Sequence, residues 1–376
     1  SILEADPTTL EVDGCAGVFA PPTGNGPLFA GSAGTVARFL TAVLAAKPGG
    51  TTHAIELDAS PQMRARPMGQ LLDALREQGA DIRCLGSEGH LPIAIGSSSS
   101  LRGGKVAFSR PASSQIVSAM LLAAGLSEKP THVILREGTP ARPYVDMTIR
   151  VLEHFGGRAR WEGSEGIAVE PRALTARDYA VEPDASSASY FLALAAIHGG
   201  EVAIRDLGSR SLQGDAAFYR VLQRMGADVE QTETTTRIRG SGRLRGVEVD
   251  MGEMPDMTLT LAVAALFADG STTIRGVEVL RHHETDRLAA VTCELRKLGA
   301  VVEERADGLR IEPPSAGLKP GISIDTYDDH RMAMAFAMVG DVAICNPGCV
   351  AKTFPDYFAE LGRLGMLAAG PDRVGP

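Results

Sequence analysis

The chain lacks three features that would assign it to a membrane or to a nucleic acid. None of the apolar runs in its 376 residues approaches the ~20 residues that a membrane-spanning helix needs. The first residues, SILEADPTTLEV, have neither the basic region nor the apolar region of a signal peptide. The formal net charge of -9 lacks the basic excess of a general nucleic-acid binder. We therefore expect a soluble protein with no membrane and no nucleic-acid partner, in which a local cluster of cations holds any anionic ligand.

Cysteine and cofactor motifs are equally sparse. The five cysteines are an odd number and are scattered along the chain, which favours a reducing cytoplasm over a disulfide framework. The pair His282–His283 has no CxxC or HxxxH companion, so a zinc site is not expected. The chain has no Walker A sequence and no GxGxxG after a strand, which argues against a nucleotide site. These absences predict a cytoplasmic location and give no sign of a metal or a nucleotide cofactor.

The sequence contains a repeat of about seventy residues. At 376 residues the chain is also too long for one ordinary core, so we expect two domains. Amphipathic helical patterns end on glycines, as at helix C-caps, and each glycine is followed by a β-prone segment. These glycines are Gly79, Gly156, Gly226 and Gly299, with a weaker copy at Gly365.

A second series of more apolar helical patterns keeps the same period. Its markers are Gly34, Ser114, Ser186, Asp256 and Asp329. The two series predict five β-α-β-α-β units with one buried and one half-exposed helix each. The segment LEVDG at 10–14 is interpreted as the tail of another unit, whose front is absent.

The starts of the apolar helices carry polar residues that a packed core does not require. A helix N-terminus presents unpaired N–H groups and the positive end of the helix dipole, which suits a phosphate or a carboxylate. Ser, Thr and Asp also cap helices routinely, so N-capping is the alternative interpretation at any single start.

Charged motifs at equivalent points of the repeat favour an anion-binding function. SPQMRARP places Arg66 before a proline, RHHETDRLAAV compresses two histidines, two carboxylates and an arginine into one helix start, and NPGCVAKTFPDYF adds Lys352 after a turn. Arg38 and Arg331 enter apolar helices, where an unpaired cation is costly. Each of these two arginines should therefore have an anionic partner, either internal or bound.

Nine motifs occur together in one order: GSAGTVAR, RARP, SSQ, RPYVDMT, DASSASYF, MPDMTLTLAV, ETDR, YDDHRMAM and AKTFPDYF. With these motifs the chain resembles the 5-enolpyruvylshikimate-3-phosphate synthases (3-phosphoshikimate 1-carboxyvinyltransferases), from about Leu3 to about Leu364. Any one motif is a weak signal, whereas nine in order are specific.

The resemblance implies an α/β (α+β) protein with the two-domain enolpyruvyl transferase fold. In that fold βαβαββ units repeat, and their helix N-termini face the cleft between the domains. We expect an N-terminal domain at 1–181, whose first unit is incomplete, and a C-terminal domain at 182–376. The family needs no metal or organic cofactor, and we expect a monomer.

The resemblance also implies a reaction. The enolpyruvyl group of phosphoenolpyruvate is joined to the 5-hydroxyl of shikimate 3-phosphate through a tetrahedral intermediate, and phosphate is released. Carried over by motif, Asp256 would take the hydroxyl proton, Glu284 would exchange protons at the methylene carbon, and Lys352 would be another proton donor. Phosphonates such as glyphosate are expected to compete for the phosphoenolpyruvate site.

The substrate-binding residues follow from the same motifs. Those expected for phosphoenolpyruvate are Gly34, Arg66, Gln115, Arg287, Arg331 and Lys352, because the paired N–H groups of arginine suit a carboxylate or a phosphate. Those expected for shikimate 3-phosphate are Ser113, Ser114, Gln115, Tyr144, Asp256 and His283. Arg38 is expected to have a supporting structural role.

The chain departs from the family pattern at several positions. The K-S-x-S-x-R motif of the first unit has no counterpart, Ser32 stands where Asn is usual, Ala141 replaces a Ser, and His283 stands where Lys commonly precedes ETDR. The absent motif favours one alternative, an inactive truncated fragment that binds anions or a partner. A second alternative is enolpyruvyl transfer to UDP-N-acetylglucosamine, although that family uses a catalytic Cys that has no suitable counterpart here. A third is a structural repeat scaffold.

Overall fold

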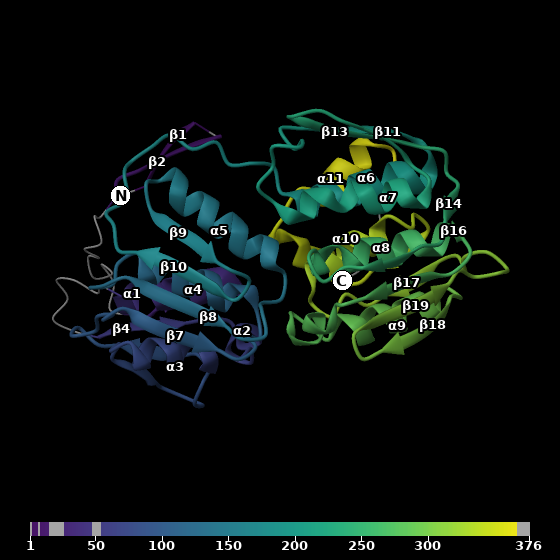
Figure 1. Ribbon diagram of the computed structural model, residues 1–376. Helices are drawn as coiled ribbons and strands as arrows, with labels where there is room; N and C mark the ends of the chain where they lie inside the picture. Colours follow the sequence, from purple (N-terminus) through teal and green to yellow (C-terminus); the bar gives the residue numbers. More distant parts are fainter. Residues whose placement is uncertain (1, 7, 15–25, 47–53, 367–376) are drawn as a thin grey trace. The chain divides into compact units, whose positions relative to one another are not determined.

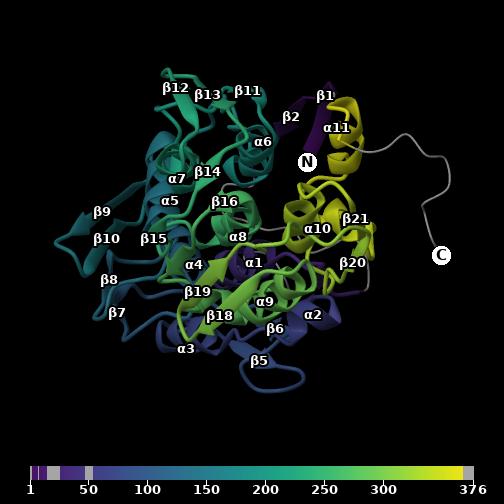
Figure 2. The same ribbon diagram turned by 90° about the vertical axis from the view of Figure 1, so that its right-hand side faces the viewer.

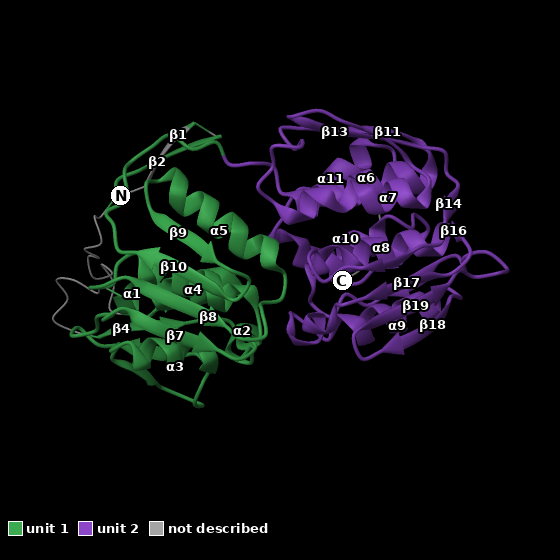
Figure 3. Ribbon diagram, in the orientation of Figure 1, with its two compact units in different colours: residues 1–180 green, residues 181–376 purple. Residues whose placement is uncertain are grey.

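The structure is a computed structural model that describes residues 2–6, 8–14, 26–46 and 54–366 (Figure 1; Figure 2 gives the view from the side). The chain divides into two compact units, Ser1–Ala180 and Val181–Pro376 (Figure 3). Cys15 lies outside the described residues, and the other four cysteines are free thiols. No helix in the described ranges combines the length and the apolar character needed to cross a bilayer.

Unit 1 contains two four-stranded sheets with the same topology. In sheet order, the strands of the first are β3 (Leu28–Phe29), β4 (Ile55–Asp58), β6 (Ile93–Ile95) and β5 (Ile82–Cys84). Those of the second are β7 (Gly104–Phe108), β8 (Thr131–Leu135), β10 (Gly166–Glu170) and β9 (Arg158–Glu162). In each sheet the first pair of strands is parallel and the other two pairs are antiparallel. A separate antiparallel hairpin, β1 (Ile2–Asp6) with β2 (Thr9–Val12), resembles the pair that closes each sheet.

The helices of unit 1 connect these strands in a fixed order. They are α1 (Gly34–Ala46), α2 (Pro61–Arg64), α3 (Gly69–Glu77), α4 (Ser114–Ala124) and α5 (Arg142–His154). Helices α1 and α4 pack on each other, and α4 is buried on nearly all sides because its sequence is apolar all round. The order is therefore β-α-β-α-β-β, as the family resemblance implies. It has one strand more than the periodicity alone predicts, because the last segment folds back as a hairpin.

Unit 2 consists of three parts, of which the second has this complete order. Its first part contains α6 (Ala185–His198), β11 (Gly200–Arg205), η1 (Gly214–Phe218), α7 (Tyr219–Met225), β12 (Asp228–Gln231) and β13 (Thr235–Gly240). The next part contains β15 (Glu248–Asp250), η2 (Pro255–Met257), α8 (Thr258–Ala264), η3 (Ala265–Phe267), β17 (Thr272–Arg275), η4 (Glu278–His282), α9 (Arg287–Lys297), β18 (Val301–Arg305) and β19 (Gly308–Glu312). The last part contains β20 (Ile322–Ile324), α10 (His330–Ala337), β21 (Val342–Ile344), η5 (Pro347–Lys352) and α11 (Tyr357–Arg363). A short parallel pair, β14 (Leu244–Arg245) with β16 (Ala268–Asp269), links the first two parts.

The apolar helices form the centre of unit 2. Helix α8 packs against both α6 and α10, and every residue of α8 is buried. The three helices lie between the sheet that contains β11 and β13 and the sheet that contains β17 and β19 (Figure 1, Figure 2). Since β15, β17, β19 and β18 repeat the strand order and directions of the unit 1 sheets, the same arrangement recurs along the chain.

A glycine follows the second helix of each seventy-residue repeat, as the sequence predicts. Gly79, Gly156, Gly226, Gly299 and Gly365 have φ angles between 75° and 111°. A Cβ atom is strained in this left-handed region, so glycine lets the chain leave the helix at these places. The repeat of about seventy residues in the sequence therefore marks the places where the chain turns after each second helix.

Charged side chains line the outer strands of three sheets. Strands β9, β12 and β18 lie at sheet edges. Their charges form cross-strand or same-strand ion pairs, including Arg158–Glu170 at 3.1 Å, Arg239–Asp228 at 3.7 Å and Arg305–Glu303 at 3.0 Å. These edges therefore present charged side chains next to their open hydrogen-bonding groups.

The core of unit 1 gives a stability prediction. Leu75 on α3 is fully buried, whereas Leu85 is half exposed. We expect Leu75→Ala to lower the free energy of unfolding of unit 1 by about 2–5 kcal/mol, because the cavity adds to the lost burial. The control Leu85→Ala should change it by less than about 0.5 kcal/mol. Urea unfolding followed by the fluorescence of Trp161, the single tryptophan, reports on unit 1; equal midpoints for the two variants would contradict this core assignment.

Candidate active site

Arg287 is the centre of a charged cluster in unit 2. It is the first residue of α9, and its side chain is only 1% exposed. Its Nε donates to Asp329 at 2.7 Å and its Nη2 to the other oxygen of Asp329 at 3.2 Å. Nη2 also donates to Glu284 at 2.7 Å, and Nη1 to Asp256 at 3.0 Å. One buried guanidinium therefore holds three carboxylates from three separate segments.

Two more cations extend the cluster. The Nη2 of Arg331 donates to the second oxygen of Asp256 at 2.9 Å, and the Nζ of Lys352 donates to the second oxygen of Glu284 at 2.5 Å. Cations and carboxylates thus alternate from Lys352 through Glu284, Arg287 and Asp256 to Arg331. The internal anionic partner expected for Arg331 is Asp256.

His283 joins the cluster through its Nδ1 atom. This atom lies 2.9 Å from the Nη1 of Arg287 and 3.6 Å from the Oδ1 of Asp256. Where the family commonly has a lysine, this chain therefore places an imidazole beside Arg287 and Asp256.

The electrostatics of the cluster keep Asp256 and Asp329 ionised. Burial opposes the charge of Asp256, but Arg331 and Arg287 outweigh it and hold the pKa of this carboxyl well below its usual value. Burial also opposes the charge of Asp329, and Arg287 again outweighs it and lowers the pKa. For Arg287, burial disfavours the cation, while Asp329, Glu284 and Asp256 raise its pKa above the usual value.

The residues behind the cluster are neutral at physiological pH. Burial and the charge of Arg331 lower the pKa of His330 to about 3. Burial raises the pKa of the Tyr190 hydroxyl to about 12, although Arg331 acts in the opposite direction. Neither side chain adds a charge. The charges of the three cations therefore equal those of the three carboxylates; the cations are Arg287, Arg331 and Lys352, and the carboxylates are Asp256, Glu284 and Asp329.

The sequence motifs identified most of this cluster but not its internal partners. The sequence marks Asp329 only as a helix start. Its ion pair with Arg287, 42 positions away, has no local sequence signal. Asp329 also accepts from the backbone N of Arg331 at 2.9 Å, which caps α10. Ser186 donates to the buried Asp215 at 2.8 Å and lies 3.4 Å from Arg331. The N-cap spacing of Asp329 and Arg331 is the one feature that predicts part of this arrangement.

A second group of cations meets Gly34 in unit 1. Gly34 begins α1, and a Cβ atom there would lie 2.7 Å from the Nη1 of Arg38, 2.9 Å from the Nη1 of Arg66 and 3.0 Å from the Oε1 of Gln115. The Nη1 of Arg38 donates to this same oxygen of Gln115 at 2.7 Å, and its Nη2 to the carbonyl of Pro67 at 3.2 Å. A Cβ atom at position 34 would require these side-chain ends to shift, and two of them are guanidinium groups.

The expected shikimate 3-phosphate residues of unit 1 lie on two packed helices. Ser113 caps α4 by accepting from the backbone N of Gln115 at 3.2 Å, and Ser114 is buried in the first turn. Tyr144 lies in the first turn of α5, which packs on α4. Ala141, the N-cap of α5, has a left-handed φ of 47° and has no hydroxyl to offer.

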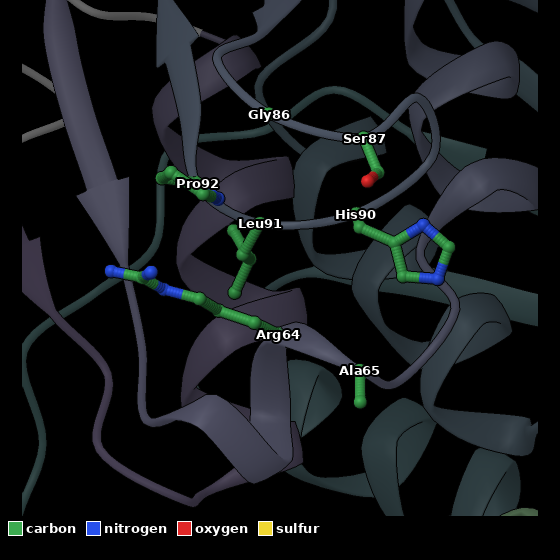
Figure 4. Close-up of a pocket in the computed structure, with 7 residues that line it drawn as sticks. All are labelled: Arg64, Ala65, Gly86, Ser87, His90, Leu91 and Pro92. Atoms are coloured by element: carbon green, nitrogen blue, oxygen red, sulfur yellow. The ribbon is translucent and has the colours of Figure 1, made fainter.

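Figure 4 shows a separate hollow of about 450 Å³ in unit 1, between the end of α2 and the loop at 86–92. Its lining residues are Arg64, Ala65, Gly86, Ser87, His90, Leu91 and Pro92. Arg64 already donates to both oxygens of Asp58, at 2.7 and 2.5 Å. The arginine of this hollow is therefore neutralised within the protein, unlike an arginine that is open to an anionic ligand.

No group of three or more His, Cys, Asp or Glu side chains in the described part of the chain is placed to hold a metal ion. The two clusters themselves can supply anion binding by arginine and lysine, and proton transfer by the carboxylates and Lys352.

Known proteins are similar to this chain in sequence and in fold. A family model described as EPSP synthase (3-phosphoshikimate 1-carboxyvinyltransferase) matches residues 1–361. A chloroplastic 3-phosphoshikimate 1-carboxyvinyltransferase of Brassica napus is 43% identical over 367 residues, which cover 93% of this chain and 70% of the relative. The enzyme of the same name from Serratia proteamaculans is 42% identical over 374 residues, which cover 97% of this chain and 85% of the relative.

A solved structure agrees with the sequence comparison. The EPSP synthase of Acinetobacter baumannii superposes with a TM-score of 0.73 at 28% identity, and the match covers 91% of this chain and 80% of that one. The resemblance and the enolpyruvyl transferase fold inferred from the nine motifs are thereby confirmed. The chain belongs to the EPSP synthase (3-phosphoshikimate 1-carboxyvinyltransferase) family.

Proposed function

We propose that this chain transfers the enolpyruvyl group of phosphoenolpyruvate to the 5-hydroxyl of shikimate 3-phosphate and releases phosphate. The observation that carries the proposal is the alternating cluster of unit 2, in which Arg287 joins Asp256, Glu284 and Asp329. In a member of this family, such a cluster supplies both the cations that a doubly anionic substrate needs and the carboxylates that proton transfer needs.

Asp256 is proposed to take the proton of the 5-hydroxyl as the oxygen bonds to C2 of phosphoenolpyruvate. Without a ligand, Arg287 and Arg331 depress the pKa of this carboxyl and make it a weak base. An anionic substrate competes for the same two guanidinium groups, and the basicity of Asp256 then rises. Substrate binding and activation of the base are thereby coupled through shared arginines.

Glu284 and Lys352 are proposed to handle the proton at the methylene carbon. Their 2.5 Å contact allows a proton to pass directly between them. The pair delivers a proton to the methylene carbon when the C–O bond forms. Glu284 then takes a proton back when the bond from C2 to the phosphate oxygen breaks, so that the double bond returns and phosphate leaves.

The remaining roles are carried over from the family motifs. For phosphoenolpyruvate they are assigned to Gly34, Arg66 and Gln115 in unit 1 and to Arg287, Arg331 and Lys352 in unit 2. For shikimate 3-phosphate they are assigned to Ser113, Ser114, Gln115, Tyr144, Asp256 and His283. The support is that Gly34, Arg66 and Gln115 meet at one point of unit 1. In unit 2, Asp256 contacts both Arg287 and Arg331.

The organisation of the working protein is also part of the proposal. It comprises domains at 1–181 and 182–376, a cytoplasmic monomer, and catalysis without a metal or an organic cofactor. The four described cysteines are free thiols, which supports a reducing compartment.

The choice of acceptor tests the proposed function. The protein is incubated with phosphoenolpyruvate and either shikimate 3-phosphate or UDP-N-acetylglucosamine, and phosphate release is measured. We expect release only with shikimate 3-phosphate, because the acceptor residues are polar groups suited to a small phosphorylated acid. Release only with the nucleotide sugar would support the alternative transferase, and release with neither would support an inactive anion-binding fragment.

The acid–base assignments predict a loss of turnover. Asp256→Ala and Glu284→Gln should each lower kcat by about 10²- to 10⁴-fold, with a smaller change in KM, because each removes a proton-transfer group. Glu303→Gln is the matched control, since Glu303 is exposed and paired only with Arg305 among the ion pairs described. A raised KM with an unchanged kcat would contradict both roles.

The close packing at Gly34 predicts a binding defect. Gly34→Ala places a methyl group within 3.0 Å of Arg38, Arg66 and Gln115, which must then move. We expect the KM for phosphoenolpyruvate to rise about tenfold or more, since displacement of binding groups by a fraction of an ångström is costly. Gly26→Ala, whose added methyl group meets no atom of the described residues within 4 Å, is the control. Equal KM values for the two variants would remove Gly34 from the binding site.

A further inference from the structure

Glu294 is a fully buried carboxylate that the reaction described above does not use. It lies on α9, seven residues after Arg287, and its side chain is 0% exposed. Seven residues are close to two helical turns, so Glu294 and Arg287 lie on the same face of α9. A buried carboxylate is costly unless donors satisfy it, so its partners indicate its role.

Two partners of Glu294, Asp325 and Tyr327, belong to one loop. Its Oε1 accepts from the hydroxyl of Tyr327 at 2.7 Å, and its Oε2 accepts from the backbone N of Asp325 at 3.1 Å. Lys297 neutralises it at 2.7 Å and also donates to the side chain of Asp325 at 2.7 Å. Glu294 therefore binds both the backbone and a side chain of the segment that precedes α10.

This segment has an unusual backbone. Tyr327 and Asp328 are consecutive non-glycine residues with left-handed φ angles of 54° and 58°. Such conformations are disfavoured for L-residues and persist only where the surroundings impose them. Asn346 contributes by donating to Asp328 at 2.9 Å, but the bonds to the loop from within α9 come from Glu294 and Lys297.

The loop leads directly into the charged cluster. The next residue, Asp329, makes the bidentate pair with Arg287 and caps the helix that carries Arg331. Helix α9 therefore holds the loop at two points, Arg287 at one end and Glu294 two turns later. The conformation between these points determines where Asp329 and Arg331 lie.

We propose that Glu294 is a positioning residue: it imposes the left-handed turn at Tyr327 and Asp328, and through it the placement of Asp329 and Arg331 for substrate binding. Glu294 touches neither substrate in this scheme, which rests on the proposed function of the cluster. Loss of its carboxylate should raise the KM for phosphoenolpyruvate more than it lowers kcat, because the proton-transfer pair of Glu284 and Lys352 is held by other contacts.

Four variants test this role by steady-state kinetics. Glu294→Ala removes the acceptors, and we expect a 10- to 100-fold rise in the KM for phosphoenolpyruvate. Glu294→Gln should restore most of the affinity, because its amide oxygen can accept from Asp325 while its NH2 donates to the Tyr327 hydroxyl. Tyr327→Phe removes one bond from a partly exposed residue and should give a smaller rise in KM. Thr292→Val is the control, since its buried hydroxyl on α9 has no hydrogen-bond partner among the described residues.

Amide hydrogen exchange gives a second measurement that does not depend on activity. We expect the amides at 325–331 to exchange at least about tenfold faster in Glu294→Ala than in Thr292→Val, because the loop opens locally. A folded Glu294→Ala variant with unchanged exchange, or with faster exchange but unchanged KM, would overturn the proposal. If Glu294→Ala does not fold, the same two measurements on Tyr327→Phe decide. If the parent protein releases no phosphate with either acceptor, the proposed function fails, and exchange still decides whether Glu294 holds the loop.

Discussion

The buried guanidinium of Arg287 is the interaction on which the rest of unit 2 depends. A cation with 1% exposure is tolerated only if carboxylates surround it, and three do so here. These carboxylates come from η2, the segment before α9 and the segment before α10. Because one side chain ties these places together, the starts of three successive helices are fixed around a single point.

The repeated topology explains why these helix starts can converge. Each repeat contains an apolar helix in the centre and a half-exposed helix on the outside. The second helix is followed by a glycine with a left-handed φ. In unit 2 the central helices α6, α8 and α10 pack together, so their first turns come from distant parts of the sequence but lie close in space. The repeats thus provide equivalent helix starts, and the residues at each start differ in charge.

The sequence predicts the units and the charged motifs, but not the contacts between motifs. The glycine period and the cap residues are local signals, and they identified the helices around Gly34, Ser114 and Asp329 correctly. The apolar helix expected at the Asp256 marker is instead divided into η2, α8 and η3, because an apolar pattern does not distinguish α from 3-10 turns. Among the hydrogen bonds described, Arg38 donates to Gln115, a neutral side chain 77 positions away, and to the carbonyl of Pro67. Long-range pairs of this kind depend on how helices pack, which no short motif encodes.

The charged edge strands have a consequence for the protein at high concentration. Strands β9, β12 and β18 leave backbone hydrogen-bonding groups open, and such edges are templates for pairing with another molecule. The ion pairs along them hold hydrated side chains beside each open edge, so a second strand would have to strip that water before it could dock. A fold that exposes a new edge with each repeat thereby limits its own tendency to aggregate.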